Sequence, residues 1–161
     1  MNCEQDLGAA MKAGMRRLAS GVAVITCRDQ QHGRLAMTAS SVTSVSDSPA
    51  SLLVCVNKAT TMASTLTPGT AFAVNILSAD QQDISNACAG GEQGEGRFHL
   101  GDWQDNAEKV PMLSGSQVCF SCKVDQVHPY GTHDIVIGQI EQVCLDNEQF
   151  SPLIYGDGGY L

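Results

Sequence analysis

Two neighbouring runs of residues are the part of this chain best suited to hold a ligand. The first, Ala36 to Ser44, is built of small and hydroxylated residues, and the second, Leu52 to Val56, is apolar and is followed by Asn57 and Lys58. Small side chains let a flat ligand lie close to a strand backbone, while hydroxyls, an amide and an ammonium supply hydrogen bonds and positive charge. The two runs indicate a site for a planar, anionic cofactor, with a core strand of small residues as an equally weighted alternative.

Metal and nucleophile patterns do not appear in the sequence. The four histidines, His32, His99, His128 and His133, lack the spacing of a helical metal pair, and there is no Gly-x-Ser-x-Gly motif. Cys119 and Cys122 form a single CxxC in a predicted strand, where residues three apart point to opposite faces, so we expect structural thiols and no metal site.

One histidine and one glycine-rich segment need separate comment. His133 follows a turn and begins a strand, from where it could overhang a pocket, although the residues alone favour a plain turn histidine. The segment Gly90 to Gly96 lacks the spacing of a dinucleotide or phosphate loop, and we predict a mobile loop there.

Composition limits the class of protein. The 161 residues suffice for one domain, expected to span 1–161. A net charge of -8, from 17 acidic and 9 basic residues, makes nucleic acid an unfavourable partner. Seven cysteines, an odd number, indicate reduced thiols, and we expect neither a leader nor a membrane-spanning segment. We therefore expect a cytoplasmic protein with no membrane contact.

The periodicities predict a mainly β protein. We expect helices over 7–20, 60–66 and 78–89, the last with a capping box of Ser78 and Gln81. Strands are expected over 21–27, 34–46, 52–56, 71–77, 117–127, 134–145 and 152–155, with 52–56 buried on both faces. Turns are expected at 47–49, 129–131 and 146–148, and the stretch around Trp103 is expected to be irregular. This order favours an antiparallel β-barrel with a few peripheral helices.

The order of segments also resembles the short-chain flavin reductase family, the reductase components of two-component flavin monooxygenases such as the 4-hydroxyphenylacetate 3-monooxygenase system. The matching pieces extend over almost the whole chain and are Gly21–Thr26, Met37–Ser41, Ser44–Ser46, Pro49–Lys58, Phe72–Ser78, Arg97-Phe98, Trp103, Pro111–Leu113 and Gly131–Asp134. The resemblance implies an FMN-binding split β-barrel, a homodimer with flavin near the subunit interface, and reduction of FMN or FAD by NADH or NADPH. The reduced flavin would then diffuse to a partner monooxygenase.

By the same resemblance, residue roles can be assigned position by position. The isoalloxazine and ribityl chain would lie against Met37, Thr38, Ala39, Ser40 and Ser41. The phosphate would lie among Cys55, Val56, Asn57, Lys58, Thr60 and Thr61. Arg97 and Phe98 would lie near the flavin, Tyr155 near the nicotinamide, and His133 beside both rings as the catalytic residue.

The chain departs from the resemblance at its end. The family commonly carries a basic residue after its last strand, whereas Gly156 to Leu161 is short and acidic. This departure motivates one alternative, a flavin-binding electron-transfer or sensor protein without reductase activity. A further alternative is a barrel with an empty pocket that serves protein interaction.

Overall fold

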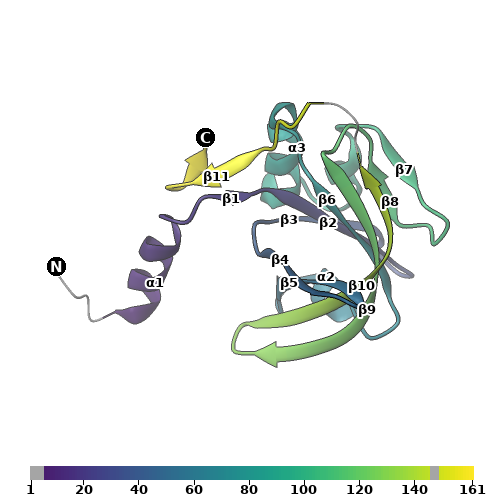
Figure 1. The fold of residues 1–161 in the computed structure, drawn as a ribbon, viewed down its shortest axis with the longest axis horizontal. Coiled ribbons are helices and arrows are strands. Elements are labelled where there is room, and N and C mark those ends of the chain that lie inside the picture. The colour runs from purple at the N-terminus through teal and green to yellow at the C-terminus, as the bar shows by residue number, and fades with distance from the viewer. Residues whose placement is uncertain (1–5, 146–148) are drawn as a thin grey trace.

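A curved, seven-stranded antiparallel sheet dominates the computed structural model, which describes residues 6–145 and 149–161 (Figure 1). The strands follow the order β3-β2-β6-β9-β10-β5-β4, and every neighbouring pair is antiparallel. Their bounds are β2 Ala23–Asp29, β3 Gly33–Ala39, β4 Val42–Asp47, β5 Ala50–Asn57, β6 Ala71–Ile76, β9 Val118–Tyr130 and β10 His133–Leu145. The predicted fold class, a mainly β split barrel with few helices, is confirmed.

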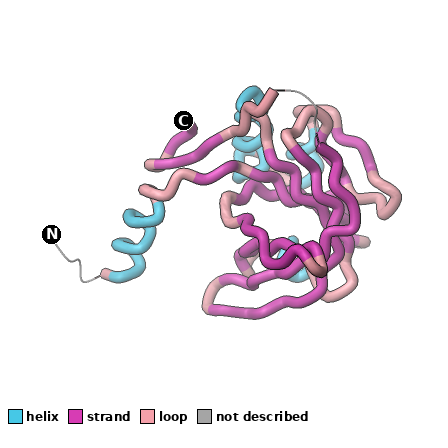
Figure 2. The backbone as a smooth tube through the Cα atoms, in the orientation of Figure 1, coloured by secondary structure: helices cyan, strands magenta, loops and turns pink. Residues whose placement is uncertain are grey.

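Shorter elements surround this sheet (Figure 2). The helical ones are α1 Leu7–Met15, α2 Thr61–Thr65, α3 Gln82–Asn86, the 3-10 turns η1 Ala79–Gln81 and η3 Gly94–Phe98, and the π-helical turn η2 Ala87–Gly91. The strands are β1 Ser20–Gly21, β11 Ile154–Gly156 and β12 Gly159–Tyr160, which form one small sheet, and the β7 Trp103–Asp105 and β8 Pro111–Leu113 hairpin.

Two apolar clusters lie on opposite sides of β2. Ala23, Ile25 and Cys27 belong to the cluster inside the barrel, whereas Val24 belongs to a second cluster under α3, η2 and η3. All of these side chains are almost completely buried, so β2 is buried on both faces. The expectation that the strand at 52–56 would be doubly buried is wrong, because Leu53 and Cys55 remain partly exposed on its outer side.

The single strand expected over 34–46 is two strands. The chain leaves β3, which pairs with β2, and enters β4, which pairs with β5, so a break at Ser40 and Ser41 is needed to change neighbours. Because β3 and β4 are the two edges of the sheet, this break marks the place where the barrel is split.

The first expected helix is also shorter than predicted. It begins with Asp6, whose carboxylate accepts from the N–H groups of Gly8 and Ala9, but it ends at Met15 instead of Ser20. The residues after it turn back into β1, which pairs with β11. α1 buries none of its side chains and stands clear of the barrel (Figure 1).

The predictions for the segment between β6 and β7 are confirmed in part. The capping box of Ser78 and Gln81 is confirmed, but the helix expected to Ala89 is a succession of 3-10, α and π turns. The glycine-rich segment is not a plain loop, because η2 extends to Gly91 and η3 begins at Gly94. The turn expected at 146–148 lies outside the described residues.

The β7–β8 hairpin was not predicted from the sequence. Two buried side chains hold the hairpin against the main sheet. Asn75 Oδ1 accepts from Leu113 N at 2.9 Å, and Thr26 Oγ1 donates to Pro111 O at 2.6 Å. The hairpin brings Trp103 edge-on to Phe98, with ring centroids 5.1 Å apart. This contact fixes the end of η3 next to β3.

Candidate functional site

A cleft of about 330 Å³ opens where β3 ends, beside the turn after β5 and the start of β10. Its lining residues are Met37, Thr38, Ala39, Ser41, Cys55, Asn57, Thr60, Cys88, Ala89, Arg97 and His133. All of these except Cys88 and Ala89 were expected from the sequence to belong to one site. The fold thus brings residues from both predicted runs, from η3 and from β10 to one place.

Two further hollows adjoin this cleft along β3. One, called here the outer hollow, measures about 390 Å³ and shares Met37, Thr60 and Arg97 with the cleft. It adds Thr61, Ala36 from the first predicted run, and the further lining residues His32, Arg34, Leu35, Ala59, Met62, Gln93 and Gly94. The cleft and the outer hollow therefore form one groove that is lined by cationic side chains at its outer end.

The second hollow lies on the other side of the cleft and is called here the tail hollow. It measures about 490 Å³ and shares Thr38, Ala39 and Ala89 with the cleft. Ser40 and Tyr155 line it as expected, together with the unpredicted Val22, Ser85, Asn86, Gly158, Gly159 and Tyr160. Tyr155 and Tyr160 meet edge-on, with ring centroids 5.3 Å apart.

The predicted hydroxyls are partly engaged inside the protein. Thr38 Oγ1 donates to Ser85 O at 2.7 Å, and Thr60 Oγ1 donates to Asn57 O at 2.7 Å. β3 is nevertheless an edge strand, so the outward N–H and C=O groups of its backbone have no strand partner. Backbone groups, more than free hydroxyls, are thus the polar atoms that β3 can offer to a ligand in the cleft.

His133 begins β10 at the rim of the cleft. It lies opposite Asn57 of β5, and its Nδ1 is 2.8 Å from Thr132 Oγ1. This contact orients the ring and leaves Nε2 without a partner among the described residues.

Arg97 places a positive charge between the cleft and the outer hollow. Its Nε donates to Glu92 O at 3.0 Å, and its Nη1 donates to Ala36 O at 2.5 Å. Within residues 6–145 and 149–161, no carboxylate forms an ion pair with it. Its charge is therefore held by neutral carbonyls and is available to an anion.

Three of the predicted residues do not line these hollows with their side chains. Lys58 Nζ donates to Gly131 O at 2.9 Å and lies 4.0 Å from Asp134 Oδ1, so it faces the β9–β10 turn. Val56 is fully buried in the core, and Phe98 is buried in the second apolar cluster.

Of the two cysteines that line the cleft, Cys55 and Cys88, the buried Cys88 is not suited to nucleophilic chemistry. Burial raises the pKa of Cys88 to about 11, so its sulfur stays protonated at neutral pH. In the described part of the chain, no three His, Cys, Asp or Glu side chains are grouped to hold a metal ion. No helix there is both long and apolar enough to cross a bilayer.

The sequence matches a known family model. Residues 15–161 match the family described as flavin reductase like domain. The chain is 35% identical over 152 residues to the FMN reductase (NADH) RutF 1 of Methylorubrum extorquens, covering 94% of this chain and 75% of that protein. It is 36% identical over 157 residues to the reductase component of the FADH(2)-dependent resorcinol hydroxylase of a Rhizobium species, covering 97% of this chain and 87% of that protein.

A solved structure has the same fold. The NADH:FAD oxidoreductase SgcE6 of Streptomyces globisporus, in complex with NAD and FAD fragments, superposes with a TM-score of 0.89 at 25% sequence identity. The superposition covers 100% of this chain and 95% of that one.

Proposed function

The chain belongs to the flavin reductase-like domain family, and from this membership we propose that it is an NADH-dependent flavin reductase whose groove along β3 binds FMN. Its reduced product serves a separate flavin-dependent monooxygenase, as the name of the Rhizobium relative indicates for that protein. The observation that carries the residue-level proposal is the meeting of the small-residue strand β3, Arg97 and His133 in one cleft.

The groove fits a planar ring system with an anionic tail. Small side chains at Ala36, Ala39 and Ala89 leave the edge of β3 open, and the cationic residues gather at one end only. The flavin supplies the redox chemistry by accepting a hydride from the nicotinamide. The chain's own residues bind and orient: the β3 backbone faces the ring, Thr60, Thr61 and Arg97 hold the phosphate, and Tyr155 contacts the nicotinamide side.

The activity itself is tested by steady-state oxidation of NADH with added FMN. We expect a rate that depends on both the protein and the flavin, and a smaller effect of NADPH at equal concentration. The absence of any flavin-dependent rate above background would remove the proposed activity.

We expect His133→Ala to slow flavin reduction by about tenfold or more, because small errors in the relative placement of reacting rings are costly. Flavin affinity should change by less than the rate, since His133 contributes one ring at the rim of the cleft. Stopped-flow absorbance gives the rate, and fluorescence titration gives the dissociation constant.

His128→Ala is the matched control for this experiment. His128 is an exposed histidine on the neighbouring strand β9 that contacts Gln126 and does not line the cleft. His128→Ala should leave the rate of flavin reduction and the flavin dissociation constant at the wild-type level. Equal losses of rate and affinity in His133→Ala would reduce His133 to a binding residue.

We further propose that the protein is a homodimer that uses the apolar side of α1. Leu7, Met11 and Met15 fall on one side of the helix and are each more than half exposed, as is Leu18 just after it. A hollow of about 610 Å³ lies between this side, β4 and the outer face of β5. Contiguous exposed apolar surface of this kind is typical of subunit interfaces.

Met15→Glu should shift the protein from two-copy to one-copy mass in sedimentation equilibrium, because a carboxylate at an apolar interface loses its hydration. Ala13→Glu adds the same charge on the opposite side of α1 and should leave the dimer intact. A wild-type protein that sediments as a single copy at micromolar concentration would contradict the proposal.

Two broader expectations also remain proposals. The six described cysteines are free thiols, which supports placement in the reducing cytoplasm. The family match over residues 15–161 supports the expectation that the chain forms one domain, 1–161.

A further inference from the structure

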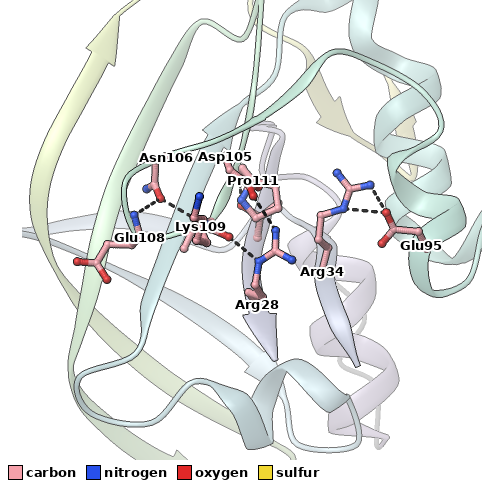
Figure 3. A network of polar contacts seen from close by, with 10 residues as sticks. Arg28, Arg34, Glu95, Asp105, Asn106, Glu108, Lys109 and Pro111 are labelled. Atoms are coloured by element: carbon pink, nitrogen blue, oxygen red, sulfur yellow. Dashed lines mark hydrogen bonds and ion pairs between the residues drawn. The ribbon is translucent and has the colours of Figure 1, made fainter. Parts of the chain in front are cut away.

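The outer hollow contains an arginine whose charge is already matched by a carboxylate. Arg34 of β3 donates from Nε to Glu95 Oε1 at 2.8 Å, and its Nη2 donates to the same oxygen (Figure 3). Arg97, in contrast, binds only carbonyl oxygens. The groove thus holds one cation that is free for an anion and a second that is available only if Glu95 moves away.

The position of Arg34 does not depend on Glu95. Its guanidinium lies 4.3 Å from the centroid of the Phe98 ring, a cation–π contact. Phe98 is itself buried and packs edge-on against Trp103. Because the aromatic pair supports the guanidinium from the side of the protein, Arg34 would keep its place after Glu95 leaves.

The charge on Arg34 needs a partner because a second arginine lies beside it. Arg28 of β2 is the residue directly opposite Arg34 in the strand register. Like charges at opposite positions of a sheet repel each other. Arg28 is turned toward the hairpin, where it binds Lys109 O at 2.7 Å and Asp105 Oδ2 at 2.8 Å (Figure 3).

Glu95 is the more easily displaced member of its pair. Its side chain is 59% exposed, whereas that of Arg34 is 26% exposed. It stands between Gly94 and Gly96, where the backbone is less restricted than at other residues. Hydrogen bonding to Arg34 lowers the pKa of Glu95, so the carboxylate is ionised at neutral pH.

We propose that Arg34 is a second, conditional phosphate-binding residue and that Glu95 is its built-in competitor, so that the pair sets the preference for FMN over riboflavin. A phosphate monoester carries a charge of about -1.5 to -2 at neutral pH and has three strong acceptor oxygens. The phosphate of FMN therefore replaces the Glu95 carboxylate on Arg34 with a net gain in binding free energy, whereas a flavin without phosphate leaves the Arg34–Glu95 pair intact. This inference rests on the proposed flavin site.

Fluorescence titrations with FMN and with riboflavin test the pair through binding alone. Glu95→Gln should tighten FMN binding by about threefold to tenfold, because the competing charge is removed, and should leave riboflavin binding unchanged. Arg34→Gln should weaken FMN binding by about tenfold, again without an effect on riboflavin. In the Arg34→Gln background, Glu95→Gln should have no further effect on FMN.

Arg28→Gln is the matched control, because it removes a guanidinium from the adjacent strand that does not line the outer hollow. It should weaken FMN binding by less than Arg34→Gln, since it removes a nearby positive charge but no donor of the hollow, and it should leave riboflavin binding unchanged. Raising the salt concentration should weaken FMN binding most in Glu95→Gln, where the phosphate meets an uncompensated charge.

Three results would overturn the inference: no effect of Glu95→Gln on FMN, an equal effect on FMN and riboflavin, or an effect that persists in the Arg34→Gln background. An equal effect on both flavins would mean that the pair only supports η3. Failure of riboflavin and FMN to bind the wild-type protein would instead remove the proposed flavin site itself.

Discussion

Arg97→Gln is expected to weaken FMN binding by about 30-fold, more than any other single change in the groove. Hydrogen bonds to charged groups contribute about 1.5–3 kcal/mol, and about 2 kcal/mol corresponds to a factor of 30 in affinity. Arg97 can contribute this in full, because among the described residues it binds the carbonyl oxygens of Glu92 and Ala36 and has no carboxylate partner there to give up. Arg34 contributes less, since its gain from a phosphate is reduced by the loss of Glu95.

Fluorescence titration measures this loss, and two comparisons define its cause. Arg97→Lys keeps the charge but not the planar pair of donors, so its affinity for FMN should lie between those of the wild type and Arg97→Gln. Riboflavin should bind Arg97→Gln almost as well as the wild type. If both flavins lose affinity equally and the urea midpoint falls, Arg97 acts by tying η3 to Ala36 and not by holding a phosphate.

The parts of the cleft that could be predicted from the sequence are those whose information is local. The small-residue run in β3 and the polar turn after β5 are each a continuous stretch with a recognisable composition. The sequence did not reveal the break at Ser40 and Ser41, because hydroxylated residues are compatible with a continuous strand. The break arises from strand pairing, since β3 and β4 have different neighbours.

The position of positive charge was harder to predict, because it depends on contacts between distant segments. Lys58 stands in the right turn, but its side chain reaches Gly131, 73 residues away in sequence. The guanidinium of Arg34 lies over the ring of Phe98 and is hydrogen-bonded to Glu95, both from a separate segment. The residue type shows that a positive charge is present. Where its side chain points depends on contacts with residues far away in the sequence, and the spacing of residues does not reveal these contacts.

The second large effect concerns stability, and it depends on a glycine in β10. Gly138→Ala is expected to lower the free energy of unfolding by about 1–3 kcal/mol, the usual range for overpacking a core. A Cβ on Gly138 would lie 2.3 Å from Phe72 Cζ and 2.6 Å from Phe72 Cε1. Phe72 is fully buried, so its ring cannot turn toward solvent to relieve the clash.

Urea unfolding of four variants separates this clash from the ordinary effect of a glycine substitution. Gly21→Ala is the control, because a Cβ there would meet no atom within 4 Å, and it should leave the midpoint almost unchanged. Phe72→Leu should lower the free energy of unfolding as a single variant. In the Gly138→Ala background the same change should lower it by less, since the smaller side chain makes room for the new methyl group. Additive losses in the double variant would show that the ring of Phe72 is not what excludes a side chain from position 138, and would point instead to the contact with Cys122, whose Cβ would lie 3.3 Å away.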